Sequence, residues 1–115
     1  MDTIYPENIE QMLLEGKRQL TTANEDLKKI GFEYANKRGE YKKRFSVLCV
    51  KYLTEKMSVN KAEIMADNEL ADLKGEYERL KILWDTQGRI CRNIAVQINA
   101  SQSILSSMNK EKDYV

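Results

Sequence analysis

The chain has 115 residues, a formal net charge of +1, one proline, five glycines and no histidine. Its length suits a single domain over residues 1–115, and so little proline and glycine argues against turn-rich sandwiches and barrels. Without histidine, Ser-His-Asp and Cys-His nucleophile pairs are excluded. Two cysteines cannot complete a structural zinc site. We therefore predict no catalytic residue, no metal site and no cofactor, and we expect that the protein is not an enzyme.

The first predicted helix runs from about residue 6 to about residue 56. Pro6 suits its first turn, where a missing backbone N–H costs nothing. One series of residues spaced by seven stays apolar or aromatic throughout this stretch: Leu13, Leu20, Leu27, Tyr34, Tyr41 and Leu48. A second series with the same spacing, offset from the first by three or four residues, is apolar at Ile9 but becomes basic from Lys37 onward.

The connector, about residues 57–68, breaks the register and is predicted to reverse the chain through a short helical turn. Ser58 suits the N-cap of that turn, because its side chain can accept a hydrogen bond from a backbone N–H that lacks a partner. Asp67 or Asn68 is expected to cap the following helix in the same way.

The second predicted helix covers about residues 69–109, followed by a frayed tail at residues 110–115. Its apolar positions alternate in steps of three and four, which is typical of a coiled-coil seam. Gln87 interrupts the seam, either to define its register or as a tolerated polar residue in a solvated layer. The predicted seam, which serves the core or an oligomer interface, comprises Leu70, Leu73, Tyr77, Leu80, Trp84, Cys91, Ile94 and Ile98.

These elements predict an all-α fold, a long antiparallel helical hairpin of coiled-coil type with a short connecting helical turn. Apolar residues beside both seams exceed what two helices can cover, so we expect self-association into an oligomeric bundle. The alternative is a compact monomer in which the first helix folds back near Gly31 or Gly39 to give three helices.

The sequence favours a cytoplasmic protein that does not act at a membrane. The longest apolar run, Val47 to Val50, is far too short to cross a bilayer. The first ten residues are acidic and lack the pattern of a signal peptide. In that compartment Cys49 and Cys91 are expected to be reduced thiols that pack in the core.

Charge is distributed unevenly along the chain. Residues 1–36 hold four basic and seven acidic residues, residues 37–61 hold eight and two, and residues 62–115 hold seven and nine. The net charge of +1 therefore conceals a strongly basic middle block. The candidate nucleic-acid contacts in this block are Lys37, Arg38, Lys42, Lys43, Arg44 and Lys51.

Two interpretations of the basic block remain open. Lys37 and Arg44 share a helix face with Tyr41, and cations beside aromatic rings suit single-stranded nucleic acid, whose phosphates and bases they can contact. Alternatively, the block is a solvated face, or it neutralises the acidic end regions within a bundle or between subunits.

The run from Asn60 to Lys81 resembles small helical proteins encoded beside recombination genes in tailed phages. In such chains a K-A-E-x-x-A turn, here beginning at Lys61, precedes a helix of the form L-x-x-x-K-x-x-Y-x-x-L-K, here beginning at Leu70. The layout is also similar to the UvsY-type recombination mediators, which place a basic stretch before the reversal and a tryptophan-containing helix after it. The matching positions are 42–44 and Trp84.

The resemblance implies an oligomeric accessory protein of phage or prophage DNA recombination, a recombination mediator. Such a protein would bind single-stranded DNA and assist a recombinase or annealing protein, or displace single-strand-binding protein. A protein-binding inhibitor or adaptor, such as an anti-CRISPR-like phage anti-defence protein, is an alternative. A structural coiled-coil assembly protein is another.

Overall fold

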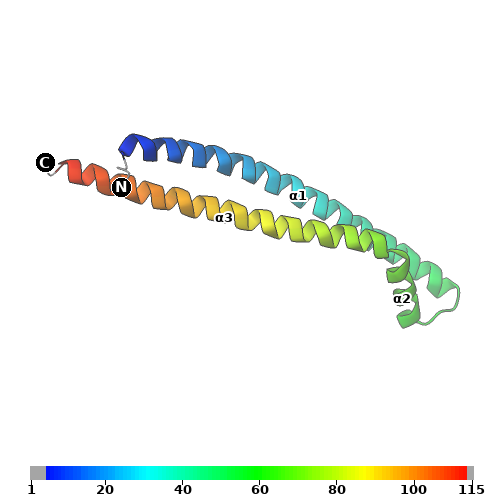
Figure 1. The fold of residues 1–115 in the computed structure, drawn as a ribbon. Helices are drawn as coiled ribbons and strands as arrows, with labels where there is room; N and C mark the ends of the chain where they lie inside the picture. Colours follow the sequence, from blue (N-terminus) through cyan, green and yellow to red (C-terminus); the bar gives the residue numbers. More distant parts are fainter. Residues whose placement is uncertain (1–4, 114–115) are drawn as a thin grey trace. The chain divides into compact units, whose positions relative to one another are not determined.

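The computed structural model describes residues 5–113, and within this range the chain is entirely helical apart from short connections. Helix α1 spans Pro6–Thr54, α2 spans Val59–Glu69 and α3 spans Ala71–Asp113. Figure 1 shows α1 and α3 alongside each other, with α2 at the reversal. The predicted all-α antiparallel hairpin is therefore confirmed. Helix α1 continues through Gly31 and Gly39, so the folded-back alternative is wrong.

Contacts within the hairpin divide it into two compact units. Unit 1 joins the described residues up to Leu27 with those from Thr86 onward, and unit 2 comprises Lys28–Asp85. Both long helices contribute to each unit, whereas α2 belongs to unit 2 alone. The candidate basic block therefore lies entirely within unit 2.

The core of unit 1 is a set of aliphatic side chains from the two long helices. Ile9, Leu13 and Ile98 are buried, and further aliphatic residues pack against them. The α1 backbone comes close to α3 at Gly16, because a Cβ there would stand 3.1 Å from Cγ1 of Ile98. The seam glutamine is satisfied, since Gln87 Nε2 donates to the carbonyl oxygen of Ala23 at 3.0 Å. This bond gives the seam glutamine a partner on α1.

Helix α2 and its C-cap residue Leu70 bury a narrow stripe within unit 2. Ala62, Ala66 and Leu70 are 1%, 0% and 7% exposed, and their spacing of four residues places them on one side. Two side-chain hydrogen bonds, from Tyr41 to Asp67 and from Tyr52 to Glu69, link α1 to α2. Small residues at the first two stripe positions allow close packing that a larger side chain would prevent.

The predicted helix boundaries need three corrections. Helix α1 ends at Thr54 rather than near residue 56, because Lys56 adopts the left-handed conformation with φ 68°. The N–H of Met57 then donates to the carbonyl of Tyr52, and that of Lys56 to the carbonyl of Leu53, which is a Schellman arrangement. The connector prediction was too narrow, since α2 extends to Glu69.

The third correction concerns α3. It begins at Ala71, so neither Asp67 nor Asn68 caps it, and Leu70 alone separates it from α2. It also continues to Asp113, beyond the predicted fraying point at residue 110. No glycine or proline lies between residues 89 and 113, and the lysines and glutamate there favour helix. The predicted N-cap Ser58 is confirmed, since its side chain accepts from the Lys61 N–H.

Lys56→Gly is expected to stabilise the protein by about 1 kcal/mol, because glycine occupies the left-handed region without the Cβ penalty that lysine bears. Urea denaturation followed by circular dichroism measures this free energy. Glycine at the helical position Thr54 should do the opposite and lower the stability. A neutral or destabilising Lys56→Gly would contradict the cap described above.

Candidate nucleic-acid interface

The six predicted cations all lie on α1 in unit 2, but two of them are already neutralised. Lys37 Nζ stands 3.4 Å from Oε2 of Glu76 and 3.9 Å from Oε2 of Glu40. Arg44 Nη2 stands 3.1 Å from Oε1 of the same Glu40. Glu40 thus bridges Lys37 and Arg44, two of the residues predicted to contact nucleic acid. These carboxylates reduce the local positive charge that Lys37 and Arg44 offer to an anion.

Three other cations are exposed and unpaired. Arg38, Lys42 and Lys43 join no ion pair with the side chains that the structure describes. Arg38 and Lys42 lie four residues apart, so they occupy one side of α1. Lys51 Nζ lies 5.7 Å from the centroid of the neighbouring Tyr52 ring, within the range of a cation–π contact. The candidate interface therefore centres on Arg38, Lys42 and Lys43 rather than on all six predicted cations.

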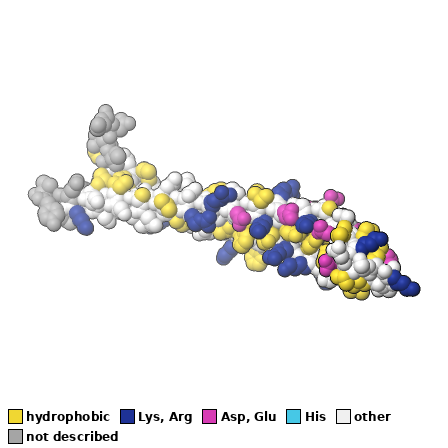
Figure 2. Space-filling model, turned by 90° about the horizontal axis from the view of Figure 1, so that it is seen from below, with side chains coloured by type: hydrophobic (Ala, Val, Ile, Leu, Met, Phe, Trp, Pro, Cys, Tyr) yellow, Lys and Arg dark blue, Asp and Glu magenta, His cyan; other side chains and the backbone are white. Residues whose placement is uncertain are grey.

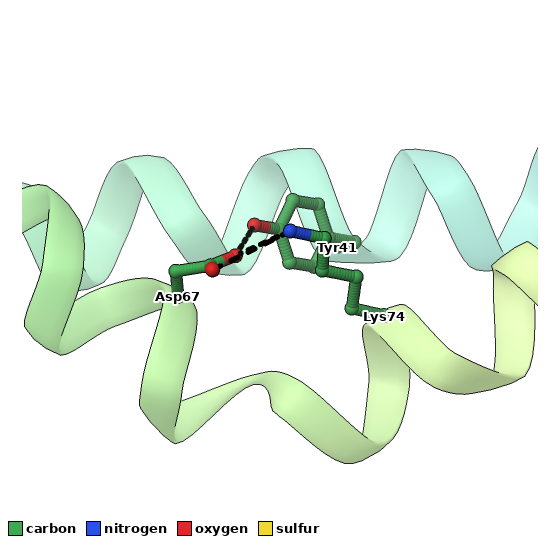
Figure 3. Close-up of polar contacts among 3 residues, drawn as sticks. All are labelled: Tyr41, Asp67 and Lys74. Carbon is green, nitrogen blue, oxygen red and sulfur yellow. Dashed lines mark hydrogen bonds and ion pairs between the residues drawn. The ribbon is translucent and has the colours of Figure 1, made fainter.

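Tyr41 packs between helices, which fits the expectation that this ring is a core or interface residue more than a base-stacking one. Its ring centroid is 5.2 Å from that of Tyr77 and 5.7 Å from that of Phe45, with the latter pair stacked. Its hydroxyl donates to Oδ1 of Asp67 at 2.5 Å, and Lys74 Nζ donates to the same oxygen at 3.2 Å (Figure 3). Tyr41 is therefore a packing residue in this structure, and its ring is not presented as a free stacking platform for bases.

The side chains of Tyr41, Asp67 and Lys74 form a cluster in which the charge of each group suits the others. Burial, together with the hydrogen bond to Asp67, raises the pKa of the Tyr41 phenol well above its ordinary value. The hydrogen bonds from Tyr41 and Lys74 lower the pKa of the Asp67 carboxyl, and Asp67 in turn raises the pKa of the Lys74 ammonium. A neutral phenol, a carboxylate and an ammonium therefore coexist over a wide pH range.

Tyr41→Phe is expected to lower the stability by about 1 kcal/mol at neutral pH, since it removes a hydrogen bond to a charged group in a partly solvated site. Because the folded pKa of Asp67 is lowered, its contribution is present above its ordinary pKa of 3.8 and is lost as the pH falls through the folded value. The raised pKa of Tyr41 gives the opposite sign: its contribution is present below 10.0 and is lost as the pH rises.

Denaturation by urea at a series of pH values from acid to alkaline measures both limbs of this dependence. Tyr41→Phe should reduce both limbs, and the raised pKa values of Tyr52 and Lys74 should preserve part of the alkaline limb. Tyr5→Phe removes an exposed phenol and serves as the matched control. Equal pH profiles for the wild type and Tyr41→Phe would show that the bond from Tyr41 to Asp67 contributes nothing to stability.

The predicted seam residues, which are Leu70 just before α3 and the others within α3, are buried to different degrees. Leu70, Cys91 and Ile98 are buried, and Leu73, Tyr77, Leu80 and Ile94 are half-buried. Trp84 is 39% exposed, and its ring stacks on Tyr34 at 5.7 Å between centroids. Its indole Nε1 would lie 3.1 Å from a Cβ at Gly31, so that glycine makes room for the tryptophan.

The described residues offer neither a metal site nor a membrane-spanning helix. Within the described residues, no three Cys, Asp or Glu side chains are grouped so that they could hold a metal ion. None of the helices found in residues 5–113 combines the length and the apolar character that a bilayer crossing requires. On the face shown in Figure 2, Lys and Arg side chains lie among hydrophobic ones, so basic and apolar surface are interspersed.

The acidic partners of the basic block, Glu40, Glu76 and Asp67, were not predicted from the sequence. Glu40 lies three residues after Lys37 and four before Arg44, which is the spacing of helical ion pairs, so this signal was present. Glu76 and Asp67 come from other helices, and no local spacing connects them to α1.

No known protein family, curated protein or solved structure matches this chain. The candidate nucleic-acid interface therefore rests on the residues of this chain alone, without support from a relative.

Proposed function

We propose that the chain binds single-stranded DNA through the exposed cations of unit 2 and acts as an accessory protein of phage or prophage DNA recombination. The observation that carries this proposal is the group of three exposed, unpaired cations, Arg38, Lys42 and Lys43, on one stretch of α1. The resemblance to recombination mediators supports a recombinase or a single-strand-binding protein as the further partner.

Binding would be electrostatic and largely independent of base sequence. Cations on α1 would contact phosphates and release their counterions, so the affinity falls steeply with salt. Tyr41 is held by packing and by its bond to Asp67, so base stacking contributes little at that position. Three cations give modest affinity, and several subunits bound along one strand would raise it through avidity.

The experiment titrates a fluorescent thirty-residue oligo-dT and measures anisotropy at several salt concentrations. Arg38→Glu/Lys42→Glu is expected to weaken binding by roughly ten- to hundredfold. It should also reduce the slope of log affinity against log salt by about 1.4, since two phosphate contacts are lost. Arg38 and Lys42 are exposed, so circular dichroism should be unchanged.

The matched control is Arg89→Glu/Lys110→Glu, which makes the same change in net charge at two exposed residues of α3 in unit 1. This control should bind within about threefold of the wild type, because long-range charge effects are screened within a Debye length. Equal losses for both double variants would mean that only net charge matters, and the proposed interface would be rejected.

A second candidate function is a protein-binding inhibitor or adaptor. It is favoured by large apolar side chains that α3 leaves exposed, a feature that often marks interaction surfaces. Wild-type protein that ignores the oligonucleotide at low salt would favour this candidate over the first. The exposed residues are Ile82, Leu83, Ile90, Val96 and Ile104.

A further inference from the structure

An apolar groove lies on unit 2 between the C-terminal part of α1 and the junction of α2 with α3. Val47 and Leu48 contribute to it from α1, and Leu70 contributes from the junction. Val47 is 64% exposed, whereas Leu70 is 7% exposed, so the groove has an open apolar wall and a buried base. Its remaining lining residues are charged: Glu40, Lys43, Arg44 and Glu69.

Three of the four charged residues around the groove have polar partners. Glu40 pairs with Arg44, and Glu69 accepts a hydrogen bond from the hydroxyl of Tyr52. Lys43 joins no ion pair among the described side chains. The groove therefore suits an apolar side chain that is accompanied by a carboxylate.

The N-terminal part of α1, in unit 1, carries a surface of that kind. Leu14 is 65% exposed. Glu10 and Glu7 precede it by four and seven residues, which places all three on one face of the helix. Glu7 and Glu10 join no ion pair among the described side chains, whereas the nearby Glu15 pairs with Arg18.

The two units are also complementary in total charge. Residues 28–85, which form unit 2, contain 13 basic and 10 acidic residues, a net charge of +3. The rest of the chain contains six basic and eight acidic residues, a net charge of −2. Unit 1 of one molecule and unit 2 of another would therefore attract each other at low ionic strength.

We propose that the face containing Glu7, Glu10 and Leu14 of one molecule docks into the groove around Val47 of a second copy of the chain. The two surfaces are different, so the contact is heterologous and each copy carries one donor face and one receptor groove. Arg38 and Lys42 lie outside the groove lining, so docking and oligonucleotide binding are tested by separate variants.

Multi-angle light scattering over a range of protein concentrations tests this docking. The wild type should reach at least twice its monomer mass of 13.4 kDa at low salt and dissociate as salt rises. Leu14→Glu and Val47→Glu should each raise the dissociation constant at least about tenfold, because each places a charge in an apolar contact. Val96→Glu, which alters an equally exposed residue of α3, should leave the mass unchanged.

A mixing experiment distinguishes docking between unlike surfaces from any symmetric contact. The Leu14→Glu chain keeps an intact groove, and the Val47→Glu chain keeps an intact face. An equimolar mixture should therefore form a dimer that neither variant forms alone. A mixture that stays monomeric, or wild type that is monomeric up to about 500 μM, would overturn the proposal.

Discussion

Ala66→Glu is expected to be the most damaging single substitution in the described part of the chain and to lower the stability by about 3–5 kcal/mol. Ala66 is 0% exposed at the centre of the buried stripe of α2. Glutamate there would place a charge, and a longer side chain, where only a methyl group fits. Helix α2 would have to detach from its packing, and the bonds that join Tyr41 to Asp67 and Tyr52 to Glu69 would be lost with it.

Urea denaturation provides the free energy, and hydrogen exchange of unit 2 shows where protection is lost. The matched control is Ala71→Glu, which makes the same change at an exposed position in the first turn of α3. Negative charge near a helix N-terminus is favourable, so this variant should be neutral or slightly more stable. Comparable losses in both variants would show that helix α2 does not pack as described.

Ile98→Ala is expected to lower the stability by about 2–4 kcal/mol through the core of unit 1. Ile98 is 8% exposed and belongs to one buried cluster with Ile9 and Leu13. Truncation removes apolar contacts and leaves a cavity that two long helices can close only in part. Val96→Ala, at an exposed position on the same helix, should change the stability by less than about 0.5 kcal/mol.

Gly16 provides a sharper version of this test. A Cβ on Gly16 would stand 3.1 Å from Cγ1 of Ile98, so Gly16→Ala should be unfavourable or neutral in the wild type despite the better helix propensity of alanine. In the Ile98→Ala background the same methyl group enters vacated space and should stabilise the protein. A double-mutant cycle measures this coupling, and additive effects would contradict the close approach of the two helices.

Local sequence signals determined the helices and much of their inner face. Proline at position 6 marks the start of α1, and the hydroxyl of Ser58 caps α2, because both effects act over only a few residues. The apolar periodicity of residues 69–109 likewise predicted the buried positions at Leu70, Cys91 and Ile98. Burial follows from repeat spacing wherever a long helix packs against one neighbour.

Local signals were insufficient at the ends of helices. Lys56 ends α1 in a left-handed conformation that its residue type does not announce, since glycine is the usual residue there. Asp67 resembled a cap in sequence, yet its carboxylate binds Tyr41 and Lys74. A polar side chain near a helix boundary has several possible partners, and the neighbouring helix decides among them.

For the basic block, too, the sequence determined some features and the packing of the helices decided others. The sequence by itself determined that eight cations gather in residues 37–61 and that Lys37, Tyr41 and Arg44 share one face of a helix. Only the tertiary structure decided that Lys37 and Tyr41 of this face meet Glu76 and Asp67, whereas Arg38 and Lys42 stay exposed. Helical periodicity determines which residues lie on one side of a helix. The register between two helices determines which charged residues meet where the helices contact each other.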